Sequence, residues 1–98
     1  MTTFLVKVGS ASMNAITLTP NLEDPLGILT PVYQLIDCDM VEVLHLEKGT
    51  VMLLDEDGKA KGKPRNDLAT WLANMSQALY GQDHIVGDVV ICPEELLK

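Results

Sequence analysis

Four of the seven basic residues in this chain lie within one heptapeptide and alternate with uncharged residues. They are Lys59, Lys61, Lys63 and Arg65. In an extended segment alternate side chains point to the same side, so these four cations would share one side. Asn66 follows directly and is typical of a helix N-cap, and the N-terminal end of a helix carries partial positive charge. The pattern predicts an anion-binding site made of these five residues.

Phosphate is the anion that this set of residues suits best. An arginine binds phosphate oxygens in a bidentate manner, whereas a lysine acts as a point charge. A structural interpretation is also open, because lysines together with Pro64 would protect an exposed edge strand from pairing with other chains. Asp67, just inside the helix, would compete with an anion for the positive end.

The residues that could ligate a metal have no recognisable spacing. Cys38, His45, His84 and Cys92 lack the close pairs that zinc sites use, so we expect no metal site. The stretch 55–58 has two aspartates and a glycine, but the oxygen ligands that complete a calcium loop do not follow it. This stretch predicts a tight turn.

Catalysis has little support in the sequence. Cys38 lies between Asp37 and Asp39, and neighbouring carboxylates raise the pKa of a thiol and reduce its reactivity. The glycines do not have the spacing of a Walker or Rossmann phosphate loop. The sequence therefore predicts a non-enzymatic protein without a cofactor. A small enzyme that uses Asp39, His45 or His84 in a cleft is the alternative that stays open.

Length and charge restrict the classes of protein and partner. The 98 residues predict a single globular domain over 1–98, with 47% hydrophobic and 21% charged residues. The net charge of −7 disfavours binding to nucleic acid, but an acidic surface attracts basic proteins. No apolar run approaches the roughly 20 residues that span a bilayer, and no signal peptide is recognised. We expect a cytoplasmic protein with two free thiols and no membrane partner.

Periodicity and turn residues predict the elements that would position these groups. Strands are expected at 4–8, 15–19, 40–46, 51–54 and 85–92. A short helix is expected to begin at Thr30-Pro31 and to end near Asp37. The order of elements predicts an α+β fold: a small, mostly antiparallel sheet of about five strands with two helices packed on one face.

The helix that begins at Asn66 has the clearest pattern. Its apolar residues recur at spacings of three and four, which predicts one buried stripe; they are Leu68, Trp71, Leu72, Met75 and Leu79. Gly81 would form its C-terminal cap. Gly87-Asp88 interrupts the last apolar run and predicts a bulge or a close backbone approach.

Four short stretches resemble an uncharacterised family of small domains, domain of unknown function thirty-eight forty-six. The stretches are Met40 to Leu44, Leu53 to Lys59, Asn66 with Ala69, and Ile85 to Val89. The similarity covers about Leu29 to Cys92. The resemblance implies an origin in phages, plasmids or bacterial genomes, and it transfers no catalytic residue.

Taken together, the residues and the resemblance lead to one hypothesis and an alternative to it. The hypothesis is a phage or mobile-element accessory protein that sequesters a small phosphorylated, nucleotide-type signal of host immunity in the host cytoplasm. The alternative is an acidic protein-interaction module that inhibits a basic host defence protein. An open sheet edge and the apolar tail with Leu96 and Leu97 also predict a homo-oligomer.

Overall fold

The computed structural model describes residues 3–18, 27–79 and 83–97. Its core is a five-stranded sheet with the order β2-β1-β5-β4-β3, in which every neighbouring pair is antiparallel. The strands are β1 (Thr3–Val6), β2 (Asn14–Ile16), β3 (Val41–His45), β4 (Thr50–Asp55) and β5 (Val89–Pro93). The helices are α1 (Leu29–Ile36), α2 (Asp67–Met75) and the 3₁₀ turn η1 (Glu94–Leu97). The predicted α+β class with an antiparallel sheet is confirmed.

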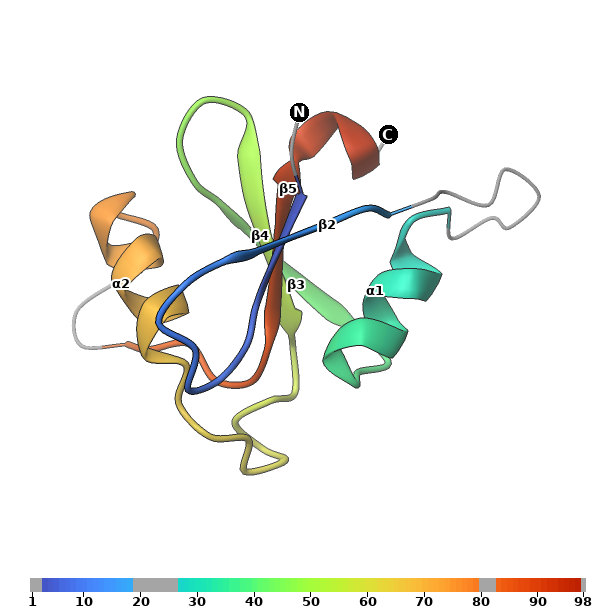
Figure 1. The fold of residues 1–98 in the computed structure, drawn as a ribbon. Helices are drawn as coiled ribbons and strands as arrows, with labels where there is room; N and C mark the ends of the chain where they lie inside the picture. Colours follow the sequence, from blue (N-terminus) through green and yellow to red (C-terminus); the bar gives the residue numbers. More distant parts are fainter. Residues whose placement is uncertain (1–2, 19–26, 80–82, 98) are drawn as a thin grey trace.

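The two helices cover opposite faces of the sheet (Figure 1), so the prediction that both pack on one face is wrong. Met52 and Leu54 of β4 belong to the core cluster beneath α2, whereas Val51 and Leu53 belong to the cluster beneath α1. Successive side chains of a strand point to opposite faces, so a strand that is apolar at every position needs cover on both sides. The uninterrupted apolar run of β4 therefore determines the two-sided arrangement.

Asn66 is the N-cap of α2, as predicted, and it is fully buried. Its Oδ1 accepts a hydrogen bond from the backbone N–H of Ala69 at 3.0 Å. Its Nδ2 donates to the carbonyl oxygens of Val6 at 3.0 Å and Gly87 at 2.9 Å. One side chain thus fixes the start of α2 against the end of β1 and the turn before β5.

Thr70, one turn into α2, continues this buried network. The Thr70 hydroxyl donates to the carbonyl of Asn66 at 2.8 Å and accepts from the backbone N–H of Ile85 at 2.9 Å. The backbone N–H of Asn66 donates in turn to the carbonyl of Ile85 at 2.8 Å. Both the N–H and the carbonyl of Ile85, which is almost completely buried, are therefore hydrogen-bonded to residues at the start of α2.

The apolar stripe predicted for this helix is only partly buried. Small residues, Ala69 and Ala73, face the sheet with Thr70 and allow a close approach of the helix. Trp71 is 57% exposed and Met75 is 61% exposed. Leu68, Leu72 and Leu79 pack at the margin of the core. The prediction of one buried stripe is wrong for Trp71 and Met75, because the narrow Ala face points at the sheet.

Several predicted boundaries shift. Helix α1 begins one residue before Thr30, with Ile28 at its N-cap position, and the left-handed residue Asp37 forms its C-cap. Helix α2 ends at Met75, and the predicted cap Gly81 lies outside the described residues. The apolar tail forms a single 3₁₀ turn over 94–97.

The last predicted strand begins four residues late, at Val89, because Gly87 redirects the chain. Gly87 has a φ of +76°, a conformation that favours glycine. A Cβ at this position would lie 2.8 Å from Cδ of Lys63, so the predicted close approach is confirmed. The backbone N–H of Gly87 donates to the carbonyl of Pro64 at 2.8 Å, and Arg65 forms an isolated bridge with Val86.

We expect Asn66→Ala to lower the free energy of unfolding by about 2–4 kcal/mol. The variant loses the helix cap and leaves two buried carbonyls without their donor. Urea unfolding monitored by circular dichroism measures the change. Asn74→Ala, at an exposed position of the same helix, is the matched control and should change stability by less than about 0.5 kcal/mol. Equal effects of the two substitutions would contradict the structural role of Asn66.

Candidate binding site

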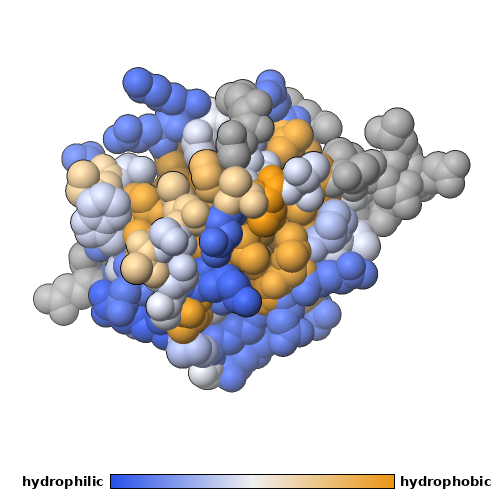
Figure 2. Space-filling view, viewed as in Figure 1, coloured by the Kyte–Doolittle hydropathy of each residue, from blue (hydrophilic) through white to orange (hydrophobic). Residues whose placement is uncertain are grey.

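The lysine segment, residues 59–65, forms turns over 59–62 and a single β-bridge at Arg65, so its predicted continuous extended geometry is wrong. The backbone N–H groups of Lys61 and Lys63 donate to the carbonyls of Asp57 and Gly58, both at 3.0 Å. These turns continue the tight turn that begins after β4. The segment lies at the lower edge of the molecule in Figure 1, where Figure 2 shows mostly hydrophilic side chains. Alternate side chains do not share one side in such a path.

Two of the four predicted cations converge on Asp55 at the end of β4. The Nζ atoms of Lys61 and Lys63 each lie 2.9 Å from Oδ2 of Asp55, whose side chain is 1% exposed. Lys63 Nζ also donates to the carbonyls of Ile36 at 2.8 Å and Asp37 at 2.7 Å. Because a helix C-terminus carries partial negative charge, Lys63 stabilises the end of α1. Its ammonium group is occupied by three acceptors.

The charge of Asp55 is stabilised in spite of its burial. Burial by itself raises the pKa of this carboxyl, but hydrogen bonds from Lys63 and Lys61 and from the backbone N–H of Asp57 outweigh it and lower the pKa. The same contact with Asp55 raises the pKa of Lys61. Asp55, Lys61 and Lys63 therefore form a charged cluster that links β4, the lysine segment and α1.

The remaining predicted site residues also have partners. Lys59 forms an ion pair with Asp83, and Arg65 Nε lies 2.9 Å from Oδ1 of Asp67. Asn66 is buried, with its side-chain amide bonded on both sides. The structure thus does not bring the five residues together into one anion site, and each of the four cations faces a carboxylate. Ligand binding by these residues stays a prediction.

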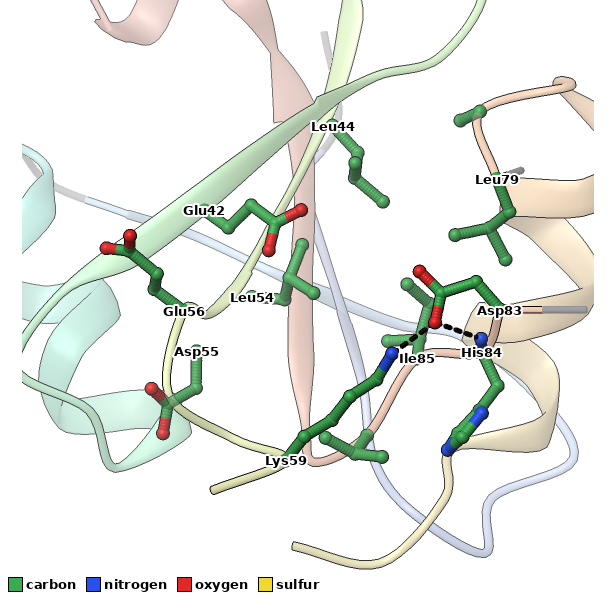
Figure 3. A pocket seen from close by; sticks show the side chains of 12 residues that line it. Glu42, Leu44, Leu54, Asp55, Glu56, Lys59, Leu79, Asp83, His84 and Ile85 are labelled. Carbon is green, nitrogen blue, oxygen red and sulfur yellow. Dashed lines mark hydrogen bonds and ion pairs between the residues drawn. The ribbon is translucent and has the colours of Figure 1, made fainter. Parts of the chain in front are cut away.

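A pocket of about 200 Å³ lies on the α2 side of the sheet, next to the edge strand β3 (Figure 3). Its floor and walls include Leu44 of β3, Leu54 of β4, and also Leu79 and Ile85, which follow α2 and precede β5. Charged and polar side chains surround this apolar surface. They are Glu42, Glu56, Lys59, Asp83 and His84. The pocket therefore combines an apolar interior with a mainly acidic rim.

The rim carries more negative than positive charge. Asp83 and Lys59 pair with each other, and this contact lowers the pKa of Asp83. Among the described residues, no ion-pair partner is found for the exposed carboxylates of Glu42 and Glu56. In Figure 3, Glu42 comes from the strand side of the pocket and Asp83 from the opposite side. The arrangement is suited to a group that is cationic at one end and aliphatic along its length.

Strand pairing and buried hydrogen bonds fix the positions of the residues that line the pocket. Glu42 and Leu44 are alternate residues of β3 and so lie on the same face, opposite Leu54 and Met52 of β4. The far wall, around Ile85, is held by the network of Asn66 and Thr70. The sequence pattern does not predict this pocket. The only local signal was the alternation of an acidic and an apolar residue within one strand.

The residues considered for catalysis do not assemble in the pocket. The imidazole of His84 points away from the carboxylate of Asp83 (Figure 3). That carboxylate accepts a hydrogen bond from the backbone N–H of His84 at 2.8 Å. His45 Nδ1 lies 3.8 Å from Oε1 of Glu94 at the exposed surface. In the ranges 3–18, 27–79 and 83–97, no three His, Cys, Asp or Glu residues are placed to hold a metal ion.

The two cysteines are free and buried in the core beneath α1. Burial raises the pKa of the Cys92 thiol. Burial, followed by the charge of Asp55, raises the pKa of the Cys38 thiol. Both thiols are therefore protonated, packed groups. Within the described part of the chain, the helices are too short and too polar to cross a bilayer.

The fold and the pocket define a small α+β domain with a mainly acidic pocket rim. A family model described as Domain of unknown function (DUF3846) matches residues 1–95. The chain belongs to this family, and the resemblance seen in the sequence is confirmed. The match also includes the N-terminal residues, which lie outside the stretches that carry the resemblance. No curated protein and no solved structure shows a significant match to the chain.

We expect the stability contribution of Asp55 to depend on pH. The pKa of Asp55 is lower in the folded than in the unfolded protein, so its contribution is complete above about pH 4 and is lost as the pH falls through the folded pKa. At pH 7, Asp55→Asn should lower the free energy of unfolding by about 1–3 kcal/mol. The difference from the wild type should shrink at about pH 3.

Urea unfolding at the two pH values measures both effects. Asp57→Asn, at an exposed neighbouring carboxylate, is the control and should have little effect at either pH. A difference between wild type and Asp55→Asn that is the same at pH 7 and at pH 3 would show that the charge of Asp55 is not what stabilises this region.

Proposed function

We propose that this protein is a non-enzymatic interaction module that binds a basic segment of a partner protein in the pocket beside β3. The observation that carries the proposal is the combination of an apolar interior, formed by residues such as Leu44 and Leu54, with the rim carboxylates Glu42 and Glu56, which have no ion-pair partner within the described ranges of the chain. The sequence predicted an acidic protein-interaction module as the alternative hypothesis, and the proposal adds a site for the basic partner.

The apolar surface and the charges contribute in different ways. A lysine or arginine side chain can lay its aliphatic stem on Leu44, Leu54 and Leu79 while its charged end reaches the rim. Exposed ion pairs contribute only about 0–1 kcal/mol each. Most of the affinity therefore comes from apolar contact, and the net charge of −7 accelerates association with a basic partner.

The predicted sequestration of a phosphorylated signal has less support from the geometry. A phosphate would have to displace Asp83 from Lys59 or Asp67 from Arg65, and Lys63 is occupied by the end of α1. The phage or mobile-element origin, the role against host defence and the homo-oligomer stay predictions. A basic partner protein in the host is consistent with each of them.

Calorimetric titration with a hexa-arginine peptide tests the proposal. We expect measurable binding that weakens with salt, and an affinity about tenfold lower for the double variant Glu42→Gln/Glu56→Gln, which is a loss of about 1.4 kcal/mol. Glu47→Gln/Glu95→Gln changes the net charge equally at exposed positions that do not line the pocket, and it is the matched control.

Two results would contradict the proposal. One is an equal loss of affinity in both double variants, which would indicate general charge attraction without a site. The other is the absence of peptide binding together with binding of a nucleoside triphosphate that Lys59→Glu and Arg65→Glu abolish. That second result would restore the phosphate hypothesis.

A further inference from the structure

We infer that the basic partner segment binds as an extended strand along the free edge of β3, so that its alternate side chains enter the pocket. This inference rests on the proposed function and specifies the conformation of the partner. Three observations carry it. Strand β3 is an edge strand, the backbone groups of its odd-numbered residues point away from β4, and two of its side chains line the pocket.

Strand β3 ends the sheet and pairs with β4 alone among the named strands. The backbone N–H of Leu46 donates to Thr50 at 2.8 Å, and the carbonyl of Met40 accepts from Glu56 at 3.0 Å. In an antiparallel ladder the hydrogen-bonded residues of a strand alternate. The even-numbered residues from 40 to 46 therefore face β4, and the odd-numbered residues direct their backbone groups away from it.

The odd-numbered residues Val41, Val43 and His45 thus offer a row of backbone donors and acceptors at the open edge. The strand has no lysine, proline or bulge of the kind that blocks edge pairing. Apolar side chains stay exposed there, with Met40 at 55% and Val43 at 36%. The opposite edge, β2, has only three residues. Edges like that of β3 are the ones that bind peptides by strand addition.

The same strand forms the wall of the pocket. Glu42 and Leu44 point to the α2 side and line the pocket, whereas Val43 points to the other face. An added strand would lie about 4.8 Å from β3, with its side chains in the same alternation. Residues opposite Glu42 and Leu44 would therefore enter the pocket, and residues opposite Val43 would cover that exposed side chain. The favoured sequence alternates basic and β-branched residues.

Charge determines which occupant this edge takes. Asp39 precedes β3, Glu42 lies within it, and Glu56 follows the paired strand, all three with exposed side chains. A second copy of the chain would bring another net charge of −7 to the same edge. A basic segment relieves this repulsion, so a partner of opposite charge is favoured over self-pairing.

An alternating lysine–valine heptapeptide is the probe for the experiment. It is compared with two derivatives of equal charge, one N-methylated at the valine amides and one at the lysine amides. In strand addition only alternate N–H groups face β3, so one derivative should bind at least tenfold more weakly than the parent peptide and the other should bind like it. Equal affinity of both derivatives, or equal loss in both, overturns the inference.

A variant of the protein tests the same contact from the other side. Val43→Pro removes an N–H that does not bond β4, and prolines are tolerated at strand edges. Val43→Thr retains the N–H and is the control. We expect the affinity for the heptapeptide to fall at least tenfold in Val43→Pro only, with thermal unfolding used to show that both variants are folded. If Val43→Pro does not fold, the methylated peptides decide alone.

The outcomes separate this inference from the proposed function. If peptide binding depends on Glu42 and Glu56 but not on N-methylation of the peptide, the proposed function is retained and strand addition to β3 is rejected. Loss of peptide binding altogether rejects both. Sedimentation of the protein alone covers the remaining occupant: a dimer that Val43→Pro dissociates assigns the edge to a second copy and overturns the inference.

Discussion

The buried side chain of Asn66 is the contact on which the arrangement of α2 and the pocket depends. Its amide caps the helix, holds the end of β1 through Val6 and fixes the turn at Gly87. Without it each of these buried backbone groups would lose a hydrogen bond. Thr70 extends the network to Ile85, which lies in the pocket wall. A polar network inside an apolar core thus fixes the position of one wall of the pocket.

The second organising element is the buried carboxylate of Asp55. It collects Lys61 and Lys63, and Lys63 also closes the C-terminus of α1. These contacts fold the lysine segment back onto the body of the protein. The most conspicuous positive feature of the sequence is therefore used largely within the fold. The rim of the pocket is mainly acidic, in agreement with the net charge.

These two elements lead to one view of the molecule. The core is covered on both faces by helices, and the edge strand β3 is the part of the sheet that stays open beside a pocket. In our proposal, backbone groups at this edge supply affinity for an extended chain, and the rim carboxylates select a basic one. Membership of the DUF3846 family is established over residues 1–95, and the binding role is our proposal for this member.

The sequence by itself determined the α+β class, the antiparallel strands, the N-cap at Asn66 and the close approach at Gly87. These features depend on local periodicity, turn residues and caps, which act over a few residues. The uninterrupted apolar run of β4 was the sequence signal that both faces of the sheet are covered, but which helix covers which face was decided only by packing. The predictions of an extended lysine segment and of a buried Trp71 were also wrong. Whether a lysine is available to an anion depends on carboxylates that are distant in sequence, as Asp83 is from Lys59. Only the tertiary structure brings such charges within a few ångströms of each other.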